Sequence, residues 1–516
     1  MKIFLFAFAL FLVGTSISQV EFTSSNLPIL IVETNGQEIV DDPKITATLK
    51  VINQTEERNY LSTQEYTFEG LIGIEFRGNT SQSFPKKSYG FELRDSVGEN
   101  VNFPLLGLPK ENDWILYAPY TDKSLLRNVL AFDMARKMGH YASRTVFCEL
   151  VINSEYQGLY VLMEKIKRDK NRVDISKLNE DENSGIDLTG GYIIKIDNPT
   201  GTFCSAWEPP AANFHIQFEY PDCDEITQEQ EDYIKDYVIQ FQDALSLQES
   251  NNADRSYVQF ADESSIIDYF LINEFSKNID AYMLSSFLYK DKNEKLVFGP
   301  IWDYNLSFGN ASLREGYLTS GWQSDINEVP WWWNVMLADP VIKSKIEERW
   351  CELRSIEFSN KSILNQIDAY SELVGEAQER NFKKWPILGE TIWPNYYVGS
   401  TFEEEINYLS VWINARLAWM DKKLNCSVSE NNSIEVFPNP VSSELNCAIY
   451  LTHETSIWMN LYDYHGKKVS SFIENVTYPE GYWQFEWQVS HLQAGKYLLK
   501  IQIGSSEIQT VKVLKL

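Results

Sequence analysis

The chain changes from a strand pattern to a helix pattern along its length, and this order limits the folds that it can adopt. From about 28 to 165, short runs rich in β-branched and aromatic residues alternate with turn residues, which predicts strands. One helix interrupts them, beginning near Thr121 and Asp122. From about 166 to 427, apolar residues recur mostly at helical spacing. The expected helices include ones around 341–354, 361–383 and 402–424. This order predicts an α+β fold of two lobes, a β-rich N-lobe and a helical C-lobe, with a cleft between them.

A separate β-rich unit is expected at the C-terminal end. Residues 428–433 are small and polar, as in a linker. Over 434–516, apolar runs alternate as short strands at regular intervals, which predicts a small Ig-like β-sandwich. Residues 19–427 are then expected to form the two-lobed domain, and 434–516 an independent one.

The first 18 residues have the layout of a secretory signal peptide. Lys2 precedes an apolar run, and the small residues Ser16 and Ser18 stand before Gln19. An uncleaved anchor is the alternative. No later run is long and apolar enough to span a membrane, so we expect an exported, soluble protein without a transmembrane segment in the mature chain.

Cysteine, histidine and charge content exclude several classes of function. Export permits disulfides, and Cys204 and Cys223 flank one polar stretch, which makes them our predicted bridge. Three of the five histidines lie in the C-terminal unit, so a histidine-rich zinc site or a Ser-His-Asp hydrolase is poorly supported. The net charge of −28 argues against nucleic-acid binding and favours a basic protein partner or metal-bridged anions.

Two aspartates flank a predicted hairpin in the helical half. The stretch FLYKDKNEKLVFG contains two β-rich runs around a polar turn. Asp280 lies before this hairpin and Asp303 lies after it, in FGPIWDYNLSFGN. A hairpin returns the chain to its start, so the two carboxylates can meet at its open end. Such a pair can hold a metal, share a proton or cap loops.

A second polar loop lies in the strand-rich half. The stretch GIEFRGNTSQSFPKKSYGFEL places Gly, Ser, Thr and Asn between two strands, with Arg77 at the entry and Lys86 and Lys87 at the exit. Backbone amides and flanking cations of this kind can cradle phosphates. Strand alternation puts Lys87 on the face of Tyr89, which predicts a lysine directed into the cleft. An ordinary solvated hairpin is the alternative.

Together these parts match the needs of phosphoryl transfer. A phosphate cradle in a β-rich lobe and two aspartates in a helical lobe allow one aspartate to orient an acceptor hydroxyl and the other to hold Mg²⁺ on a nucleotide. Hard oxygen ligands and few histidines suit magnesium better than zinc.

Several motifs in order resemble the spore coat protein H (CotH) kinase family of atypical secreted protein kinases. They are FRGNTSQSFPKKSYGFELRD, LLGLPKENDWILYAPYTDKSLLRN, ELVINSEYQGLYVLMEKIKRDKNRVDI, TGGYIIKIDN and FGPIWDYNLSFGN, between about 28 and 422. The resemblance implies a divergent protein-kinase-like fold that transfers the γ-phosphate of ATP to serine or threonine of secreted or surface proteins, with Mg²⁺ and with Mn²⁺ as an alternative.

The same resemblance implies roles for individual residues. It gives Asp280 the catalytic role and Asp303 the metal-binding role. We assign Arg77, Lys86, Lys87 and Glu164 to nucleotide binding.

One departure from the family pattern concerns the second metal ligand. Kinases place an asparagine after the catalytic aspartate, and here that place is taken by Ser285 and Ser286. Asn305 is expected to compensate as a metal ligand, and a weakened or inactive kinase is the alternative.

The C-terminal unit resembles the type IX secretion sorting domain of Bacteroidetes. FPNPVSSEL near its start, LQAGKYLLKI and the closing VKVLKL carry the likeness over 434–516. It implies the type IX machinery as a partner and delivery through the periplasm and outer membrane to the cell surface or medium. A generic Ig-like binding module is the alternative.

A tryptophan cluster supports a second hypothesis for the whole protein. Trp331, Trp332 and Trp333 are consecutive, and a groove lined by them would suit a glycan-binding or adhesion protein on a catalytically inactive kinase-like scaffold. Packing in the core is the more common role of such side chains.

Overall fold

A computed structural model describes residues 20–54, 57–199, 206–210, 212–250, 255–427, 434–437, 439–451, 453–505 and 508–516. The predicted signal peptide and the linker at 428–433 lie outside the described residues, as does Cys204 of the predicted disulfide. Cys223 is itself disulfide-bonded. A bridge that the sequence did not predict joins Cys351 to Cys426.

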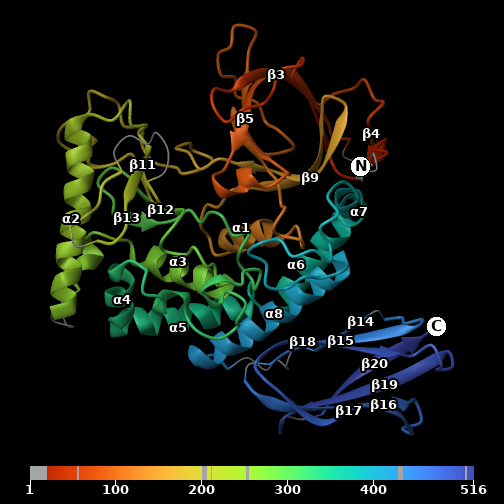
Figure 1. Cartoon of the computed structure of the whole chain (residues 1–516). Coiled ribbons are helices and arrows are strands. Elements are labelled where there is room, and N and C mark those ends of the chain that lie inside the picture. The colour runs from red at the N-terminus through yellow and green to blue at the C-terminus, as the bar shows by residue number, and fades with distance from the viewer. Residues whose placement is uncertain are drawn as a thin grey trace, which may run out of the picture.

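The strand-rich first part of the chain forms a closed barrel in the order β2-β3-β5-β6-β7-β9-β8 (Figure 1). Its strands are β2 Ile29–Glu33, β3 Ile45–Ile52, β5 Phe68–Arg77, β6 Ser88–Arg94, β7 Asp113–Tyr117, β8 Thr145–Ile152 and β9 Glu155–Glu164. The short strands β1 Ser24–Ser25 and β4 Asn59–Tyr60 pair beside it. Alternate strand residues such as Tyr89, Phe91 and Leu93 fill the barrel interior with an apolar core.

Helix α1, Arg127–Lys137, begins later than predicted. The carboxylate of Asp122 still accepts hydrogen bonds from the backbone N–H groups of Arg127 at 2.8 Å and Ser124 at 3.1 Å. The predicted cap position is wrong, because the N-cap of α1 is Leu126, and Asp122 instead supports the non-helical turn before the helix.

A four-stranded sheet, in the order β11-β10-β12-β13, lies among the helices that follow the barrel. Its strands are β10 Tyr192–Ile196, β11 Ile216–Tyr220, β12 Ser286–Lys290 and β13 Leu296–Phe298. The helices are α2 Gln228–Ser250, α3 Glu263–Ser276, α4 Trp331–Ala338, α5 Pro340–Ser355, α6 Asn360–Leu373, α7 Gly375–Lys384 and α8 Phe402–Lys423. One apolar core joins this sheet to the helices, and α7 lies against β9 of the barrel.

The predicted single helix at 361–383 is wrong, because the chain leaves helical geometry at Val374, between α6 and α7. The core of the helical part includes Trp332 and Trp333, which are 0% and 1% exposed. These two tryptophans contact Phe214, Phe241 and Phe298. Their position favours a packing role over a groove lining.

The C-terminal unit is a two-sheet β-sandwich, as predicted. One sheet has the order β14-β15-β18 and the other β17-β16-β19-β20. The strands are β14 Ile434–Phe437, β15 Glu444–Leu451, β16 Thr455–Asp463, β17 Lys468–Tyr478, β18 Gly481–Gln488, β19 Gly495–Ile503 and β20 Gln509–Lys515. The sandwich has its own apolar core and lies against α8 (Figure 1).

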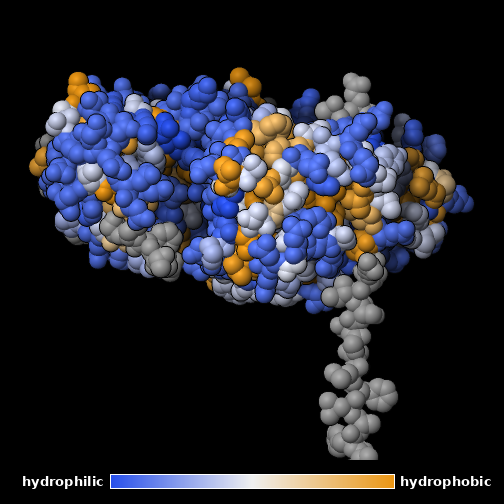
Figure 2. Space-filling model, turned by 90° about the horizontal axis from the view of Figure 1, so that it is seen from above, coloured by the Kyte–Doolittle hydropathy of each residue, from blue (hydrophilic) through white to orange (hydrophobic). Residues whose placement is uncertain are grey.

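The surface seen from above is mostly hydrophilic, with apolar side chains in separate patches (Figure 2). This view agrees with the 23% of charged residues in the sequence. Within the described ranges, no helix combines the length and apolar character that crossing a membrane requires.

Candidate active site

The predicted hairpin is present and brings the region of Asp280 next to Asp303. Strands β12 and β13 pair antiparallel, with Leu288 opposite Phe298 and Lys290 opposite Leu296. Asp303 follows β13 after a short turn and has a positive φ of 59°. That backbone conformation is uncommon for a residue other than glycine and recurs at functional sites.

The carboxyl group of Asp303 has an environment in which the charges of Asp280 and Asp197 both affect its pKa. Burial, together with the negative charges of Asp280 and Asp197, raises the pKa of Asp303 to about 7, while Arg77 opposes this shift. A carboxyl group in this setting holds its proton near neutral pH unless a cation compensates the charge. The site is therefore suited to receive a cation.

Asp280 lies in the turn between α3 and β12. Burial raises its pKa, Asp197 adds to the effect, and Arg314 opposes it. One guanidinium nitrogen of Arg314, Nη1, is 3.4 Å from Asp280 Oδ1 and donates to the backbone carbonyl of Ile279 at 3.0 Å. The carboxylate is thus partly covered by an arginine from a later segment.

Asp197 is a third acidic residue of this cluster, and the sequence reasoning did not assign it. It follows strand β10, which pairs antiparallel with β12 so that Ile196 lies opposite Ser286. The backbone N–H of Ser285 donates to its carboxylate, and burial raises its pKa. Asp197 therefore lies beside the position where kinases place the second metal-binding asparagine. Its place directly after the apolar run YIIKI was the available signal.

Arg77 comes to the same site from the barrel. It ends strand β5 opposite Ser88 of β6, and its guanidinium group lies 5.8 Å from the ring centre of Trp302, the neighbour of Asp303. Burial lowers the pKa of Arg77, against the nearby charges of Glu219 and Asp303. The structure thus places Arg77 and Asp280 near enough to Asp303 for both of their charges to affect its pKa.

The two lysines differ from the sequence prediction. Lys86 is 2% exposed, and its ammonium group donates to the backbone carbonyl of Leu159 at 2.5 Å and to Asn381 Oδ1 at 2.8 Å. Lys87 is half-buried and donates to the backbone carbonyl of Gln82. Strand alternation placed Lys87 on the same face as Tyr89, and that face forms the barrel interior. The prediction that this face opens on the cleft is therefore wrong.

Glu164 is a fully buried member of an ion pair. Its carboxylate lies 2.8 Å from Arg144 Nη1 and accepts the backbone N–H of Arg144 at 3.0 Å and the hydroxyl of Tyr141 at 3.3 Å. Because it ends strand β9, this pair fixes the chain where it leaves the barrel. The structure does not bring Glu164 into the acidic cluster.

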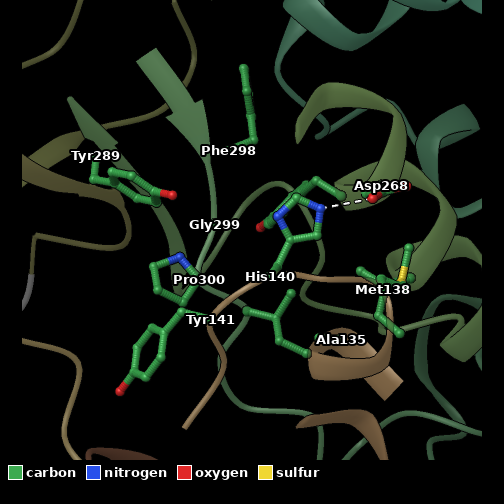
Figure 3. A pocket seen from close by; sticks show the side chains of 12 residues that line it. Ala135, Met138, His140, Tyr141, Asp268, Tyr289, Phe298, Gly299 and Pro300 are labelled. Carbon is green, nitrogen blue, oxygen red and sulfur yellow. Dashed lines mark hydrogen bonds and ion pairs between the residues drawn. The ribbon is translucent and has the colours of Figure 1, made fainter. Parts of the chain in front are cut away.

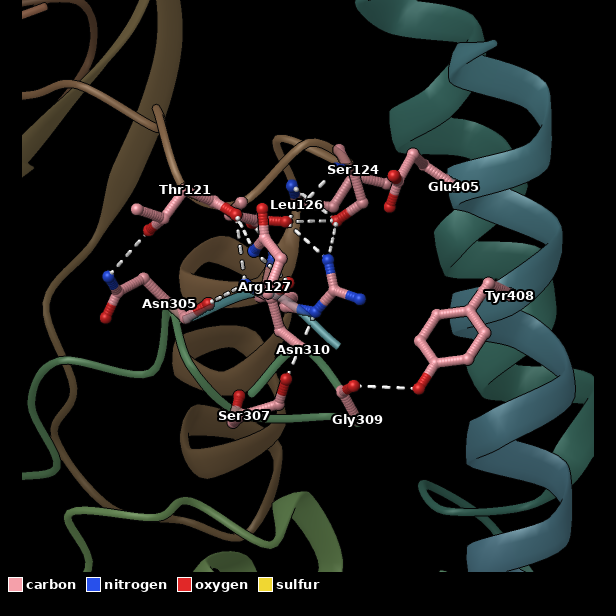
Figure 4. A network of polar contacts seen from close by, with 12 residues as sticks. Thr121, Ser124, Leu126, Arg127, Asn305, Ser307, Gly309, Asn310, Glu405 and Tyr408 are labelled. Carbon is pink, nitrogen blue, oxygen red and sulfur yellow. Dashed lines mark hydrogen bonds and ion pairs between the residues drawn. The ribbon is translucent and has the colours of Figure 1, made fainter. Parts of the chain in front are cut away.

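The loop after Asp303 is fastened to α1 and its preceding turn by amide side chains (Figure 4). Asn305 Nδ2 donates to Thr121 Oγ1 at 3.3 Å. Asn310 Nδ2 donates to the backbone carbonyls of Asn305 at 2.7 Å and of Thr121 at 3.2 Å. These bonds turn the amide nitrogen of Asn305 toward the α1 turn, which leaves its amide oxygen as the group able to bind a metal.

A buried ion pair supports the same loop. Arg127 and Asp122 lie 2.6 Å apart and are fully buried, and Arg127 Nε donates to the backbone carbonyl of Ser307 at 3.1 Å (Figure 4). The hydroxyl of Tyr408, on α8, donates to the carbonyl of Gly309 at 2.7 Å. The position of Asp303 is therefore set by α1 on one side and α8 on the other.

A small cavity lies behind the hairpin (Figure 3). Gly299 and Pro300 line it together with His140 and Asp268, whose Nε2 and Oδ2 atoms are 2.7 Å apart. Arg349 also pairs with Asp268 at 2.9 Å. The volume of this cavity, about 20 Å³, is enough for roughly one water molecule. The cavity is too small for a nucleotide.

Among the ranges that the structure describes, no three His, Cys, Asp or Glu side chains converge as a ready-made metal site.

Comparison with known proteins assigns the family. A model of the CotH kinase protein family matches residues 74–420, more than half of the chain, and the protein belongs to this family. The secretion system C-terminal sorting domain matches residues 435–515. This type IX sorting domain indicates export to the cell surface or secretion.

Other comparisons add little. No curated protein matches the chain. Among solved structures, dimeric latent PorU from Porphyromonas gingivalis is similar with 16% identity over 18% of this chain and 10% of that one, at a TM-score of 0.15. The chain thus covers about a tenth of the length of that structure.

Proposed function

We propose that this protein is a secreted protein kinase that transfers the γ-phosphate of ATP to serine or threonine hydroxyls of secreted or surface proteins. The observation that carries the proposal is the meeting of Asp280 and Asp303 at the open end of one hairpin, facing Arg77 from the barrel. Membership of the CotH kinase family supports the same chemistry.

Asp280 is the residue that we assign to the acceptor hydroxyl. Burial and Asp197 raise its pKa, which makes it a better proton acceptor than an exposed aspartate. It lies in a short turn held at both ends by regular structure, so it can hold a hydroxyl in a fixed direction. Positioning of this kind supplies much of the rate enhancement in phosphoryl transfer.

Asp303 would hold Mg²⁺, with Asn305 as a second oxygen donor. Bound Mg²⁺ neutralises charge on the nucleotide phosphates. Arg77 lies on the opposite wall of the site and can contact a phosphate group directly. Lys87, in the loop of residues 78–87, is the remaining candidate for a phosphate contact.

Asp197 could replace the second metal-binding asparagine of kinases, which this chain lacks. Its carboxylate accepts from the backbone of Ser285, at the position where other kinases carry the second metal-binding side chain. A carboxylate from the neighbouring strand β10 can supply the oxygen that the serine side chains do not. The presence of this carboxylate supports an active enzyme over an inactive scaffold.

Thermal stability with and without Mg-ATP tests the proposal. Ligand at 100 times its Kd should raise the free energy of unfolding by about 2.7 kcal/mol. ATP with EDTA should raise it less, because the metal contact is absent. No change across a millimolar titration of Mg-ATP would favour the non-catalytic alternative, and a glycan array would then be the next measurement.

A further inference from the structure

The segment 303–321, which follows the proposed metal ligand, is contacted by the sorting domain near its end, at Ser320, and is linked to that domain near its beginning through Tyr408 of α8. The contacts come from residues 478–484, where β17 turns into β18. We call these residues the docking hairpin. They contact Tyr408 of α8 and Tyr397 in the loop before it, where the sorting domain meets the helical part (Figure 1).

The first contact is polar. Glu480 Oε1 accepts a hydrogen bond from Ser320 Oγ at 2.6 Å. The backbone carbonyl of Ser320 accepts from Lys277 Nζ at 2.5 Å, and the carbonyls on both sides of Ser320 accept from Arg416. Glu480 therefore binds a point that the helical part of the protein already holds firmly.

The second contact is aromatic. The ring of Tyr482 lies 5.0 Å from that of Tyr397 and 4.9 Å from that of Tyr408, and the Tyr397 hydroxyl donates to Gln484 at 3.1 Å. Tyr408 in turn donates to the carbonyl of Gly309, in the loop after Asp303. The docking hairpin thus contacts the end of segment 303–321 directly and its beginning through Tyr408.

A strained turn lies between the two contacts. Arg314 and Glu315 have consecutive positive φ values of 46° and 53°. Such conformations cost on the order of 1 kcal/mol each and persist where the surroundings hold them. In this turn, Arg314 donates to the carbonyl of Ile279 and pairs with the carboxylate of Asp280.

We propose that the sorting domain is an intramolecular inhibitor of the site. With the docking hairpin in place, segment 303–321 is held closed, and Arg314 occupies the carboxylate of Asp280. Release of the sorting domain removes the Glu480 hydrogen bond and the packing of Tyr482 on Tyr408, so the segment opens more often, although Lys277 and Arg416 still hold Ser320 and its neighbours, and the acceptor hydroxyl can then reach Asp280. The role of Asp280 rests on the proposed function, whereas the coupling between the two domains does not.

The test uses the full chain and two readouts that need no catalysis. Hydrogen exchange reports the opening of segment 303–321, and carbodiimide labelling detected by mass spectrometry reports the accessibility of Asp280. The variants are Glu480→Ala and Tyr482→Ala. Glu454→Ala, in the exposed turn between β15 and β16, is the matched control.

We expect Glu480→Ala to speed exchange in 311–321 by about fivefold, the effect of losing one hydrogen bond. Tyr482→Ala should also speed exchange in 303–310. Both should increase the labelling of Asp280, and Arg314→Ala should do so with the hairpin contact intact.

Exchange equal to that of the unmodified protein in both hairpin variants would overturn the coupling. Faster exchange with unchanged labelling of Asp280 would contradict the claim that segment 303–321 blocks access to Asp280. Phosphate transfer is measured separately: its absence from every variant would count against the proposed function, while exchange and labelling still decide the coupling.

Discussion

Replacing Asp303 with asparagine should stabilise the protein at alkaline pH and not at acid pH. The ordinary pKa of an aspartate is 3.8, and that of Asp303 is about 7 because partial burial and the negative charges of Asp280 and Asp197 raise it. Each pH unit between these values corresponds to about 1.4 kcal/mol, so ionised Asp303 lowers the free energy of unfolding by up to about 4 kcal/mol at pH 8. Because the residue is only partly shielded from solvent, we expect about half of this, ~2 kcal/mol.

The sign follows from proton binding. Between about pH 4 and pH 7 the folded protein holds a proton that the unfolded chain has released, so this group makes stability fall as the pH rises. Asparagine has the same shape and no charge. The advantage of Asp303→Asn should therefore be below about 0.5 kcal/mol at pH 4, grow up to pH 7 and then stay constant.

Urea unfolding at pH 4 and pH 8, in EDTA, measures this difference. Asp181→Asn, at an exposed position in the turn after Asn179, is the matched control for the loss of a carboxylate. Equal effects of Asp303→Asn at pH 4 and pH 8, or a loss of stability at pH 8, would refute the reasoning. Either result would mean that Asp303 is ionised without strain in the free protein.

Four further changes have expected outcomes. Lys86→Ala should lower the free energy of unfolding by about 2 kcal/mol, because it leaves buried hydrogen-bond acceptors unpaired. Lys87→Ala should change the free energy of unfolding by less than about 0.5 kcal/mol and should weaken nucleotide binding more than Lys86→Ala does. Urea unfolding measures the first effect and nucleotide titration the second. Replacing Cys351 and Cys426 together with serine should lower stability by about 2 to 4 kcal/mol, and an unchanged melting temperature would exclude a structural role for this disulfide. Deleting 434–516 should leave a folded protein in the periplasm, whereas normal surface display without these residues would contradict the sorting assignment.

Sequence patterns predicted the parts of this fold that depend on neighbouring residues. The hairpin between Asp280 and Asp303 was predicted from two β-rich runs around a polar turn, and β12 and β13 confirm it. The β-sandwich was predicted from regular strand spacing, and its two sheets confirm it. In both cases the pairing partners are close in sequence, so the local pattern was sufficient.

Long-range pairing explains what the sequence did not predict. Asp197 joins the site because β10 pairs with β12, whose residues are far away in the chain. The environment of Lys86 depends on α7, which supplies its partner Asn381. The direction of Lys87 was misjudged because closure of the barrel turns the face of Tyr89 inward, and alternation alone does not show what a strand face contacts.

Transfer of labelled phosphate from ATP tests the central claim most directly. The measurement compares the unmodified protein with Asp280→Asn and Asp303→Asn, using a generic basic protein and the chain itself as acceptors, with Mg-ATP binding measured in parallel. We predict transfer by the unmodified protein, a loss of at least about 100-fold with retained Mg-ATP binding for Asp280→Asn, and loss of both for Asp303→Asn. Binding of Mg-ATP without any transfer by the unmodified protein, or equal transfer by Asp303→Asn, would contradict the account.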